Sequence, residues 1–198
     1  MGQDDNELVL MAQRGDDDAF EALVYRYDRR ILGIAMRYVG DMDAAKDVYQ
    51  EVFLRVYHGL SRFKFESRFS TWLYRIAVNT CLTHEAARRR RKHLSIEREV
   101  IGPTDGGNTS ARRLPEQLVA PASADRETVG GEIAERIRAA LDRLSPQQRM
   151  VFILRHFEGH KLREIATLLS CAEGTVKKHL FSGTNRLREA LADVYARG

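Results

Sequence analysis

The sequence has little of what marks secreted, membrane-spanning or sheet-rich proteins. Only two cysteines occur among 198 residues, and both are expected to be buried small apolar residues in a reducing cytoplasm. No apolar run approaches the roughly 18 residues that cross a bilayer. The acidic start, residues 1–7, offers no apolar signal core. Since no segment alternates in the manner of a strand, we expect a cytoplasmic, all-α protein without membrane insertion.

Motifs for catalysis are also missing. The chain contains no glycine-rich phosphate loop, pair of catalytic carboxylates or nucleophile elbow, so we do not expect an enzyme. Two spacings could hold zinc, Cys81 with His84 and His156 with His160. Neither has a second matching pair nearby, and Gly159 interrupts the helix between the two histidines. We therefore expect no metal and no cofactor.

Charge is distributed unevenly along the chain. Residues 1–60 carry 7 basic and 12 acidic side chains, whereas residues 61–98 carry 10 basic and 3 acidic ones. This polarity suggests a basic partner for the first segment and a polyanion for the second. The alternative, ordinary solvated helix faces, stays open for each segment taken alone. The run Arg88–Lys92 is harder to explain in that way, because it directly follows an aromatic stretch.

Apolar residues recur at three- and four-residue steps, as in amphipathic helices. A helix is expected over residues 17–39, between the capping oxygens of residues 16–18 and the stop at Gly40. A second is expected over residues 41–60, and a third from Ser70 or Thr71 into the arginines. Periodicity fails over residues 95–131, which hold three of the four prolines. We expect a flexible linker there.

Helical periodicity returns after the linker. Helices are expected over residues 132–141, from Pro146 behind the cap Ser145 to about residue 158, and over residues 161–169 and 173–195. A tight turn at residues 170–172, with Val176 wedged between the flanking helices, is typical of a helix-turn-helix. The predicted fold is two small helical domains, residues 1–94 and 132–198, joined by the linker.

Two segments are suited to nucleic acid. Residues 68–79 combine aromatic and amide side chains just before the basic run, so cations could hold phosphates while flat rings meet unstacked bases. The outward positions of the last helix could face the major groove or its phosphates. The alternative is an ordinary helical hairpin with a solvated basic face. Gly183 in this helix either permits close approach to DNA or simply weakens the helix.

Four blocks, taken together and in this order, resemble an extracytoplasmic-function sigma factor, the smallest class of bacterial transcription initiation factors. In the first half they are residues 20–27 (FEALVYRY), residues 43–53 (DAAKDVYQEVF) and residues 69–80 (FSTWLYRIAVNT). The fourth comprises LSPQQR at residues 144–149, EIA at 164–166 and GTVK at 174–177. The resemblance covers about residues 20–94 and 132–192.

The resemblance implies three binding surfaces. Asp47, Gln50 and Glu51 would bind the clamp helices of the largest subunits, β and β′, of core RNA polymerase. The first domain would melt and read the −10 promoter element, with Asn79 recognising an extruded base. The residues implied there are Phe63, Lys64, Trp72, Tyr74, Arg75, Asn79, Arg88, Arg89 and Arg90. The residues implied for the −35 element are Thr175, Lys177, Lys178, Phe181, Ser182 and Arg186.

The family also implies an anti-sigma factor as a regulatory partner and a place on the nucleoid when the chain is bound to polymerase. Two alternatives stay open. A stand-alone helix-turn-helix regulator would have no use for the acidic stripe at Asp47–Glu51. An anti-sigma or adaptor protein would have no use for Arg88–Lys92. The recognition helix also departs from many relatives in having Ser182–Asn185 (SGTN) where they carry Arg and Ala, and fewer cations there imply weaker binding of phosphates.

Overall fold

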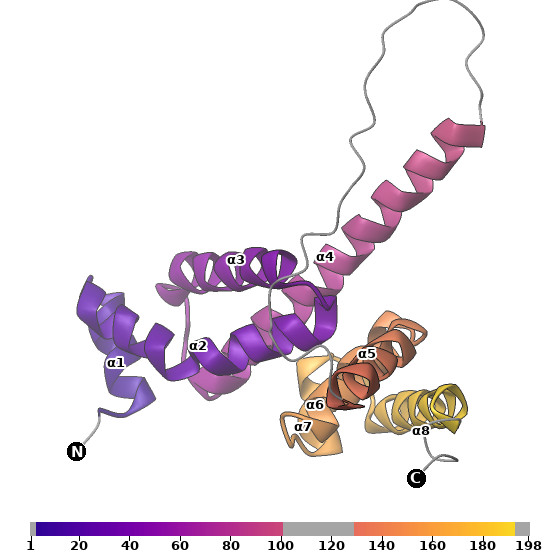
Figure 1. The fold of residues 1–198 in the computed structure, drawn as a ribbon. Coiled ribbons are helices and arrows are strands. Elements are labelled where there is room, and N and C mark those ends of the chain that lie inside the picture. The colour runs from indigo at the N-terminus through magenta and orange to yellow at the C-terminus, as the bar shows by residue number, and fades with distance from the viewer. Residues whose placement is uncertain (1–2, 101–128, 193–198) are drawn as a thin grey trace, which may run out of the picture.

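The computed structural model describes residues 3–100 and 129–192, which form eight helices and no strand. The expected all-α class is thereby confirmed. Helices α1 to α4 make one group and α5 to α8 a second group beside it (Figure 1). No helix in the described ranges is long and apolar enough to cross a membrane.

The first group begins with a short helix that the sequence analysis did not predict, α1 (Asp5–Gln13). The next two helices follow the expected signals closely. In α2 (Asp17–Val39) the Asp16 side chain accepts a hydrogen bond from the backbone of Ala19, and Gly40 ends the helix with a left-handed φ of 77°. In α3 (Met42–Leu60) Asp41 caps the first turn in the same way, through Ala44.

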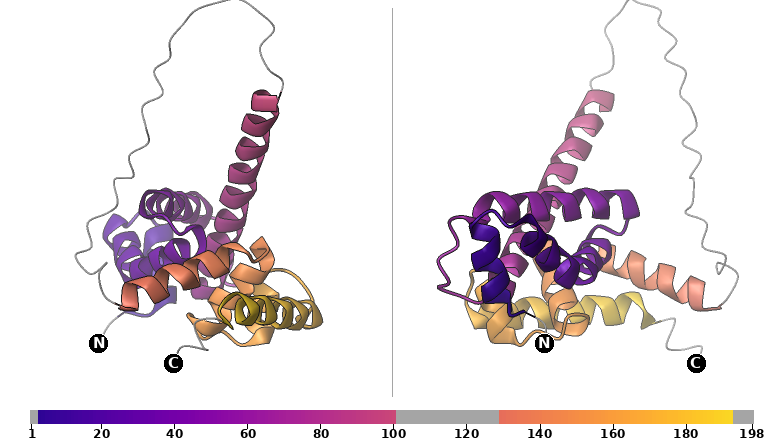
Figure 2. Two further views of the ribbon diagram at one scale, coloured as in Figure 1. Left: turned by 45° about the vertical axis from the view of Figure 1, so that its right-hand side comes forward. Right: turned by 90° about the vertical axis from the view of Figure 1, so that its left-hand side faces the viewer.

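Helix α4 (Phe69–Val100) is the longest in the described chain, and its far end projects beyond both groups (Figures 1 and 2). Helix α4 continues through residues 95–100, past the start of the expected linker at residue 95. From Phe69 to the residue before Gly102 the sequence contains no glycine or proline that would end the helix. The rest of the predicted linker up to residue 128 lies outside the described residues.

The second group contains α5 (Val129–Asp142), α6 (Pro146–His156), α7 (Leu162–Leu168) and α8 (Glu173–Ala190). At the start of α6 Ser145 and Gln148 form the reciprocal capping box, with Pro146 in the first turn. The turn between α7 and α8 places Ser170 at a φ of 51°. The predicted end of the last helix at residue 195 lies outside the described residues.

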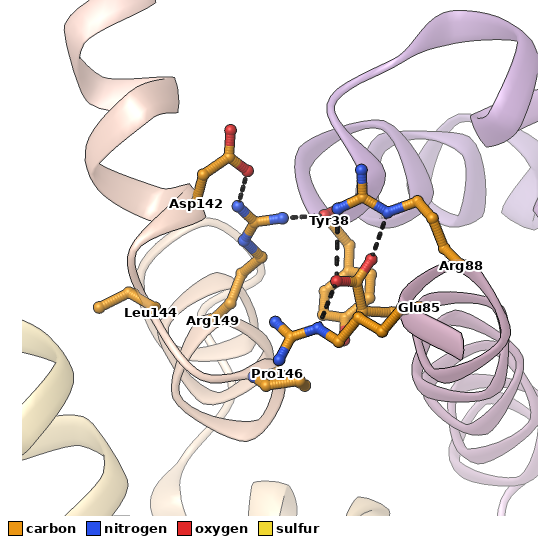
Figure 3. Close-up of a pocket in the computed structure, with 8 residues that line it drawn as sticks. Tyr38, Glu85, Arg88, Asp142, Leu144, Pro146 and Arg149 are labelled. Carbon is orange, nitrogen blue, oxygen red and sulfur yellow. Dashed lines mark hydrogen bonds and ion pairs between the residues drawn. The ribbon is translucent and has the colours of Figure 1, made fainter. Parts of the chain in front are cut away.

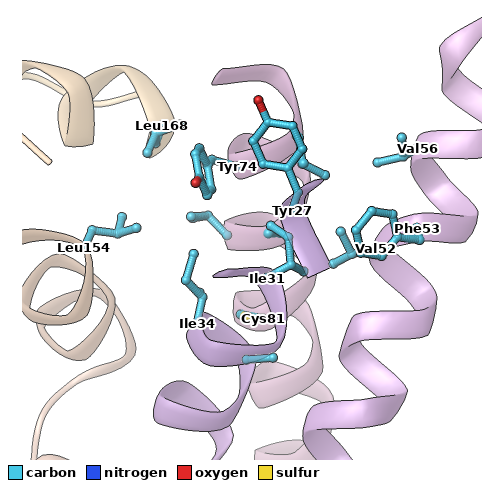
Figure 4. Close-up of a cluster of buried hydrophobic side chains, with 14 of the residues drawn as sticks. Tyr27, Ile31, Ile34, Val52, Phe53, Val56, Tyr74, Cys81, Leu154 and Leu168 are labelled. Atoms are coloured by element: carbon cyan, nitrogen blue, oxygen red, sulfur yellow. The ribbon is translucent and has the colours of Figure 1, made fainter. Parts of the chain in front are cut away.

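The larger of two buried apolar clusters spans both groups, while a smaller one, around Leu141, Leu144 and Leu187, lies within the second group. Val52, Val56 and Ile31 fill the first group, while Leu154 and Leu168 of the second lie toward Tyr74 and Ile34 of the first (Figure 4). Helices α2 and α4 of the first group contact α6, and α4 also contacts α7. The domains are therefore packed against each other in this structure.

Candidate polymerase and nucleic-acid interfaces

One side of α3 carries the predicted acidic stripe. Asp47, Gln50 and Glu51 are exposed, while Val48 and Val52 on the opposite side are buried. Glu51 is joined to Arg55 by an ion pair of 2.6 Å. Beyond the stripe, two large apolar side chains, Leu54 and Tyr57, are also exposed on α3. The stripe thus combines acids, an amide and apolar contact area, which suits docking on a basic, amphipathic partner.

A shallow pocket adjoins this stripe between α2 and α3. It has a volume of about 350 Å³. Its lining combines apolar and charged side chains: Asp28, Arg29, Leu32, Lys46, Tyr49 and Gln50. The α2 side of this pocket could not be recognised from the sequence, because its residues meet Gln50 only after the two helices pack.

Four rings cluster where the loop before α4 meets the start of that helix. Phe63 lies 5.1 Å from Trp72, 6.1 Å from Phe69 and 5.0 Å from Phe65, measured between ring centroids. Phe63 and Phe69 are buried, whereas Trp72 is half-buried and Lys64 is exposed. Phe63 therefore forms the buried base of this cluster, and Phe65 is the ring that the loop exposes to solvent. Phe65, at a left-handed φ of 60°, belongs to the loop of residues 62–68 that the family resemblance places at the wall of the base pocket, although it was not among the individually predicted −10 residues.

The exposed face of α4 brings three of the predicted −10 residues together. Trp72, Arg75 and Asn79 follow steps of three and four, so they lie on one side of the helix. Arg75 and Asn79 are exposed. The Asn79 side chain does not cap or bond the helix backbone, and it makes no hydrogen bond to any described residue. Its amide is thus free to bind an external group.

Tyr74 points away from that face and toward the second domain. Only 5% of its surface is exposed. Its ring lies 5.1 Å from the ring of His160, and its hydroxyl accepts a hydrogen bond of 3.3 Å from Arg30. The neighbouring Arg75 donates to the backbone carbonyl of Thr167 on α7 at 3.3 Å. Two predicted DNA-binding residues therefore contact the second domain in this arrangement.

The basic run of α4 begins beside a buried acid, Glu85. Its carboxylate accepts hydrogen bonds of 2.8 Å from Nε of Arg88 and 2.8 Å from Nε of Arg89 (Figure 3). Burial works to raise the pKa of Glu85, but the hydrogen bonds from the two arginines outweigh burial and leave its pKa lowered. Arg90 is exposed. The carboxyl therefore stays ionised at neutral pH and neutralises part of the basic run.

A polar pocket of about 290 Å³ separates this run from α6. Across it lies Arg149, which donates to the backbone carbonyls of Tyr38 and Leu141 and to the Asp142 carboxylate (Figure 3). The domains are also joined by an ion pair between Arg37 and Glu158, at 3.4 Å. The junction of the two domains is therefore both apolar and ionic.

The helix-turn-helix is formed by α7 and α8. Val176 is fully buried between them, as expected. On α8, Thr175, Lys177 and Lys178 are exposed, and 70% of the Phe181 surface is open to solvent. The part of α8 that follows Phe181 is less exposed than predicted, since Ser182 is half-buried.

Two contacts with Gln148 on α6 account for the lower exposure of this part of α8. Gly183 is buried, and a methyl group there would lie 3.5 Å from Cβ of Gln148. That is an ordinary van der Waals distance, so α6 has room for a methyl group there, and residue 183 faces α6 and not the outer surface of the helix. Arg186 donates to Oε1 of Gln148 at 3.1 Å. Gln148 consequently links the capped start of α6 to a predicted DNA-binding arginine, a tie between residues 38 positions apart.

Comparisons with known proteins agree with this geometry. Residues 23–92 match the sigma-70 region 2 family, and residues 134–187 match the sigma-70 region 4 family. The chain is 35% identical over 189 residues to the RNA polymerase sigma-H factor of Pseudomonas aeruginosa, covering 96% of this chain and 94% of that protein. It is also 35% identical over 191 residues to the ECF RNA polymerase sigma-E factor of Escherichia coli, covering 94% and 92%.

Solved structures show the same fold at lower identity. CnrH, in complex with the cytosolic domain of CnrY, aligns with a TM-score of 0.64 at 20% identity, covering 96% of this chain and 97% of that one. The sigma factor RpoE of Bartonella quintana, in complex with the anti-sigma factor NepR, aligns with a TM-score of 0.60 at 21% identity, covering 87% and 96%.

Proposed function

The chain belongs to the extracytoplasmic-function class of RNA polymerase sigma factors, and from that membership we propose how its surfaces divide the work of promoter recognition. It directs promoter-specific transcription initiation by RNA polymerase. In our proposal, residues 1–94 bind the polymerase clamp and open the −10 element, and residues 132–198 read the −35 element. Bond formation remains with the polymerase, in the cytoplasm and at the nucleoid.

The polymerase-binding surface in this proposal is the acidic stripe of α3. Asp47, Gln50 and Glu51 would meet basic side chains of the clamp helices in β and β′, while Leu54 contributes apolar area. The carboxylates of Asp47 and Glu51 are exposed in the free chain, so forming the contact would not first require breaking a buried ion pair. Opposite charges of this kind raise the rate of encounter as well as the affinity.

The single observation that carries the −10 proposal is the continuity of α4. One unbroken helix presents Trp72, Arg75 and Asn79 on an exposed face and, three turns later, the arginines from Arg88 onward. Rings and an amide can hold an unstacked base and read its edge, while guanidinium groups hold the backbone. Tyr74 would join this surface only after the second domain moves. Phe63 would act by supporting Trp72 and Lys64.

The −35 surface in this proposal is the start of α8. Thr175, Lys177, Lys178 and Phe181 would enter the major groove, with Ser182 and Arg186 at its edge. Lys177 is paired with Glu173 at 3.0 Å, which orients it along the helix. Phe181 offers apolar area for a thymine methyl group. The sigma factor RpoE, which has the same fold, is bound to an anti-sigma factor, and we propose such a partner for this chain as well.

The experiment that tests the proposal is transcription with purified core polymerase on genomic fragments. The chain should support promoter-dependent run-off transcripts and make thymines near −10 reactive to permanganate. Asp47→Lys with Glu51→Lys should abolish core binding. Asp18→Lys with Glu21→Lys on α2, which changes the charge equally at exposed positions, should retain it. A chain that binds promoters alone, unaffected by the α3 reversal, would contradict the proposal.

A further inference from the structure

Glu85 is unusual because it is an acid buried within the most basic part of the chain. Only 5% of its surface is exposed. Its two oxygens receive three hydrogen bonds, from Nε and Nη2 of Arg88 at 2.8 and 3.3 Å and from Nε of Arg89 at 2.8 Å. The side chains of the two arginines remain 57% and 53% exposed. The buried carboxylate of Glu85 therefore holds two guanidinium groups that face solvent.

The atoms that Glu85 leaves unused are informative. Nη1 of Arg88 and both Nη atoms of Arg89 have no partner among the described side chains. A single carboxylate thus fixes the two guanidinium groups next to each other by their inner edges, with their outer N–H groups directed away from it. Guanidinium groups bind phosphate oxygens through such pairs of N–H donors.

We propose that Glu85 is a positioning residue for phosphate binding by Arg88 and Arg89, holding their guanidinium groups as a preformed clamp for the promoter backbone. This inference rests on the proposed function of the two arginines. Arginine side chains are flexible, and fixing them before binding removes an entropic cost from the encounter with DNA. Glu85 itself does not touch the phosphate.

Simple electrostatics predicts the opposite sign, which makes the proposal testable. A carboxylate beside a phosphate backbone repels it, so replacing Glu85 by an uncharged residue should strengthen DNA binding if the charge alone mattered. If the carboxylate positions the arginines, the same replacement should weaken binding although it removes a negative charge. The two accounts therefore differ in direction and not merely in size.

The test uses holoenzyme reconstituted with core polymerase and a fluorescent promoter fragment, titrated at several KCl concentrations. Glu85→Gln is compared with the pair Arg88→Ala and Arg89→Ala, with the triple variant, and with Glu21→Gln. The last changes the charge equally at an exposed position on α2. Thermal unfolding of each free variant establishes that it is folded.

We expect Glu85→Gln to weaken promoter binding about threefold to tenfold, the scale of a lost charge-assisted contact. The arginine pair should weaken it further and lower the salt slope by about 1 to 2, for one or two lost phosphate contacts. In the arginine-pair background Glu85→Gln should have no additional effect, because Glu85 acts through those residues. Glu21→Gln should leave promoter affinity unchanged.

Four results would overturn the inference, and they are distinguishable. If Glu85→Gln strengthens binding, or weakens it equally without the arginines, Glu85 is not positioning them. If the arginine pair itself leaves affinity and salt slope unchanged, the proposed phosphate role fails and takes the inference with it. If Glu85→Gln is unfolded, Glu85→Asp takes its place. Asp keeps the charge but shortens the reach, and unchanged promoter binding by that variant would overturn the inference.

Discussion

The guanidinium of Arg149 on α6 donates a hydrogen bond of 2.7 Å to the backbone carbonyl oxygen of Tyr38 on α2. That carbonyl belongs to the last turn of α2, where carbonyl groups lack partners within the helix. The same side chain donates to the carbonyl of Leu141 at 3.0 Å and pairs with Asp142. Arg149 is 6% exposed, so it satisfies buried acceptors in both domains at once.

Replacing Arg149 by Ala should lower the free energy of unfolding by about 2–4 kcal/mol, because two carbonyl groups in a partly dry junction lose their donor. Arg149→Lys should recover only part of this loss, since one ammonium group cannot serve three separated acceptors. Urea unfolding followed by circular dichroism measures the difference. Arg143→Ala, at an exposed neighbouring position, is the control and should change stability little. A loss from Arg149→Ala no larger than the control's would contradict this prediction.

The packing of Tyr74 against His160 predicts that polymerase changes the domain arrangement. If Tyr74 contributes to the −10 surface, the second domain has to leave it first. In the free chain, tetranitromethane should therefore nitrate Tyr25, which is 68% exposed, much faster than Tyr74. Adding core polymerase without DNA should speed nitration of Tyr74. Fast nitration in the free chain, or continued protection in the holoenzyme, would show that this contact does not control access.

Local signals explain which helices the sequence predicts well. Helix α2 has the expected bounds because Asp16 and Gly40 mark its ends through their own hydrogen bonding and backbone preference. Helix α6 begins at Pro146, as predicted, for the same kind of reason. Both signals act within a few residues, so they can be recognised without knowing the fold.

Features that depend on distant contacts were missed. The short helix α1 has an acidic start and is stabilised from elsewhere, with Leu8 and Val9 buried and Asp5 paired with Arg26 at 2.5 Å. The burial of Tyr74 and the reach of Arg149 to Tyr38 likewise depend on how the two domains meet. Candidate residues could be chosen from helical spacing and family motifs. Their present accessibility could not, because it is set by partners more than 80 residues away in the sequence.

Gly59 is predicted to control the position of Trp72. A methyl group at residue 59 would lie 3.0 Å from Cζ2 of Trp72, closer than packed atoms normally approach. Gly59→Ala should therefore displace the indole, at an overpacking cost of about 1–3 kcal/mol that is offset by the roughly 1 kcal/mol by which Ala favours helix over Gly. Trp72 is the only tryptophan in the chain, so its fluorescence reports the shift directly.

The matched control is Gly174→Ala, at a helical position where the added methyl group meets nothing within 4 Å. It should leave Trp72 fluorescence unchanged and slightly raise stability, because Ala favours helix over Gly. If Trp72 contributes to base recognition, Gly59→Ala should also reduce permanganate reactivity at −10. Unchanged Trp72 fluorescence in Gly59→Ala would contradict the prediction, because the methyl group would then be accommodated without moving the indole.

The two cysteines should differ in reactivity with pH. Cys81 is fully buried, and burial raises its pKa to about 12, whereas Cys171 is half-buried in the turn before α8. Because the thiolate is the reactive form, iodoacetamide at pH 8 should label Cys171 and spare Cys81 until the chain unfolds. In Cys171→Ser, where Cys81 is the remaining thiol, labelling should follow global unfolding.

The unfolded chain releases the Cys81 proton near pH 9, its ordinary pKa, but the folded chain holds that proton to about pH 12. The stability associated with the neutral thiol is therefore complete below pH 9 and is lost progressively as pH rises toward 12. Cys81→Ala should show a shallower decline in urea unfolding midpoint between pH 8 and about 10. Equal labelling of both thiols in the folded chain, or parallel pH profiles for the wild-type chain and Cys81→Ala, would contradict the prediction.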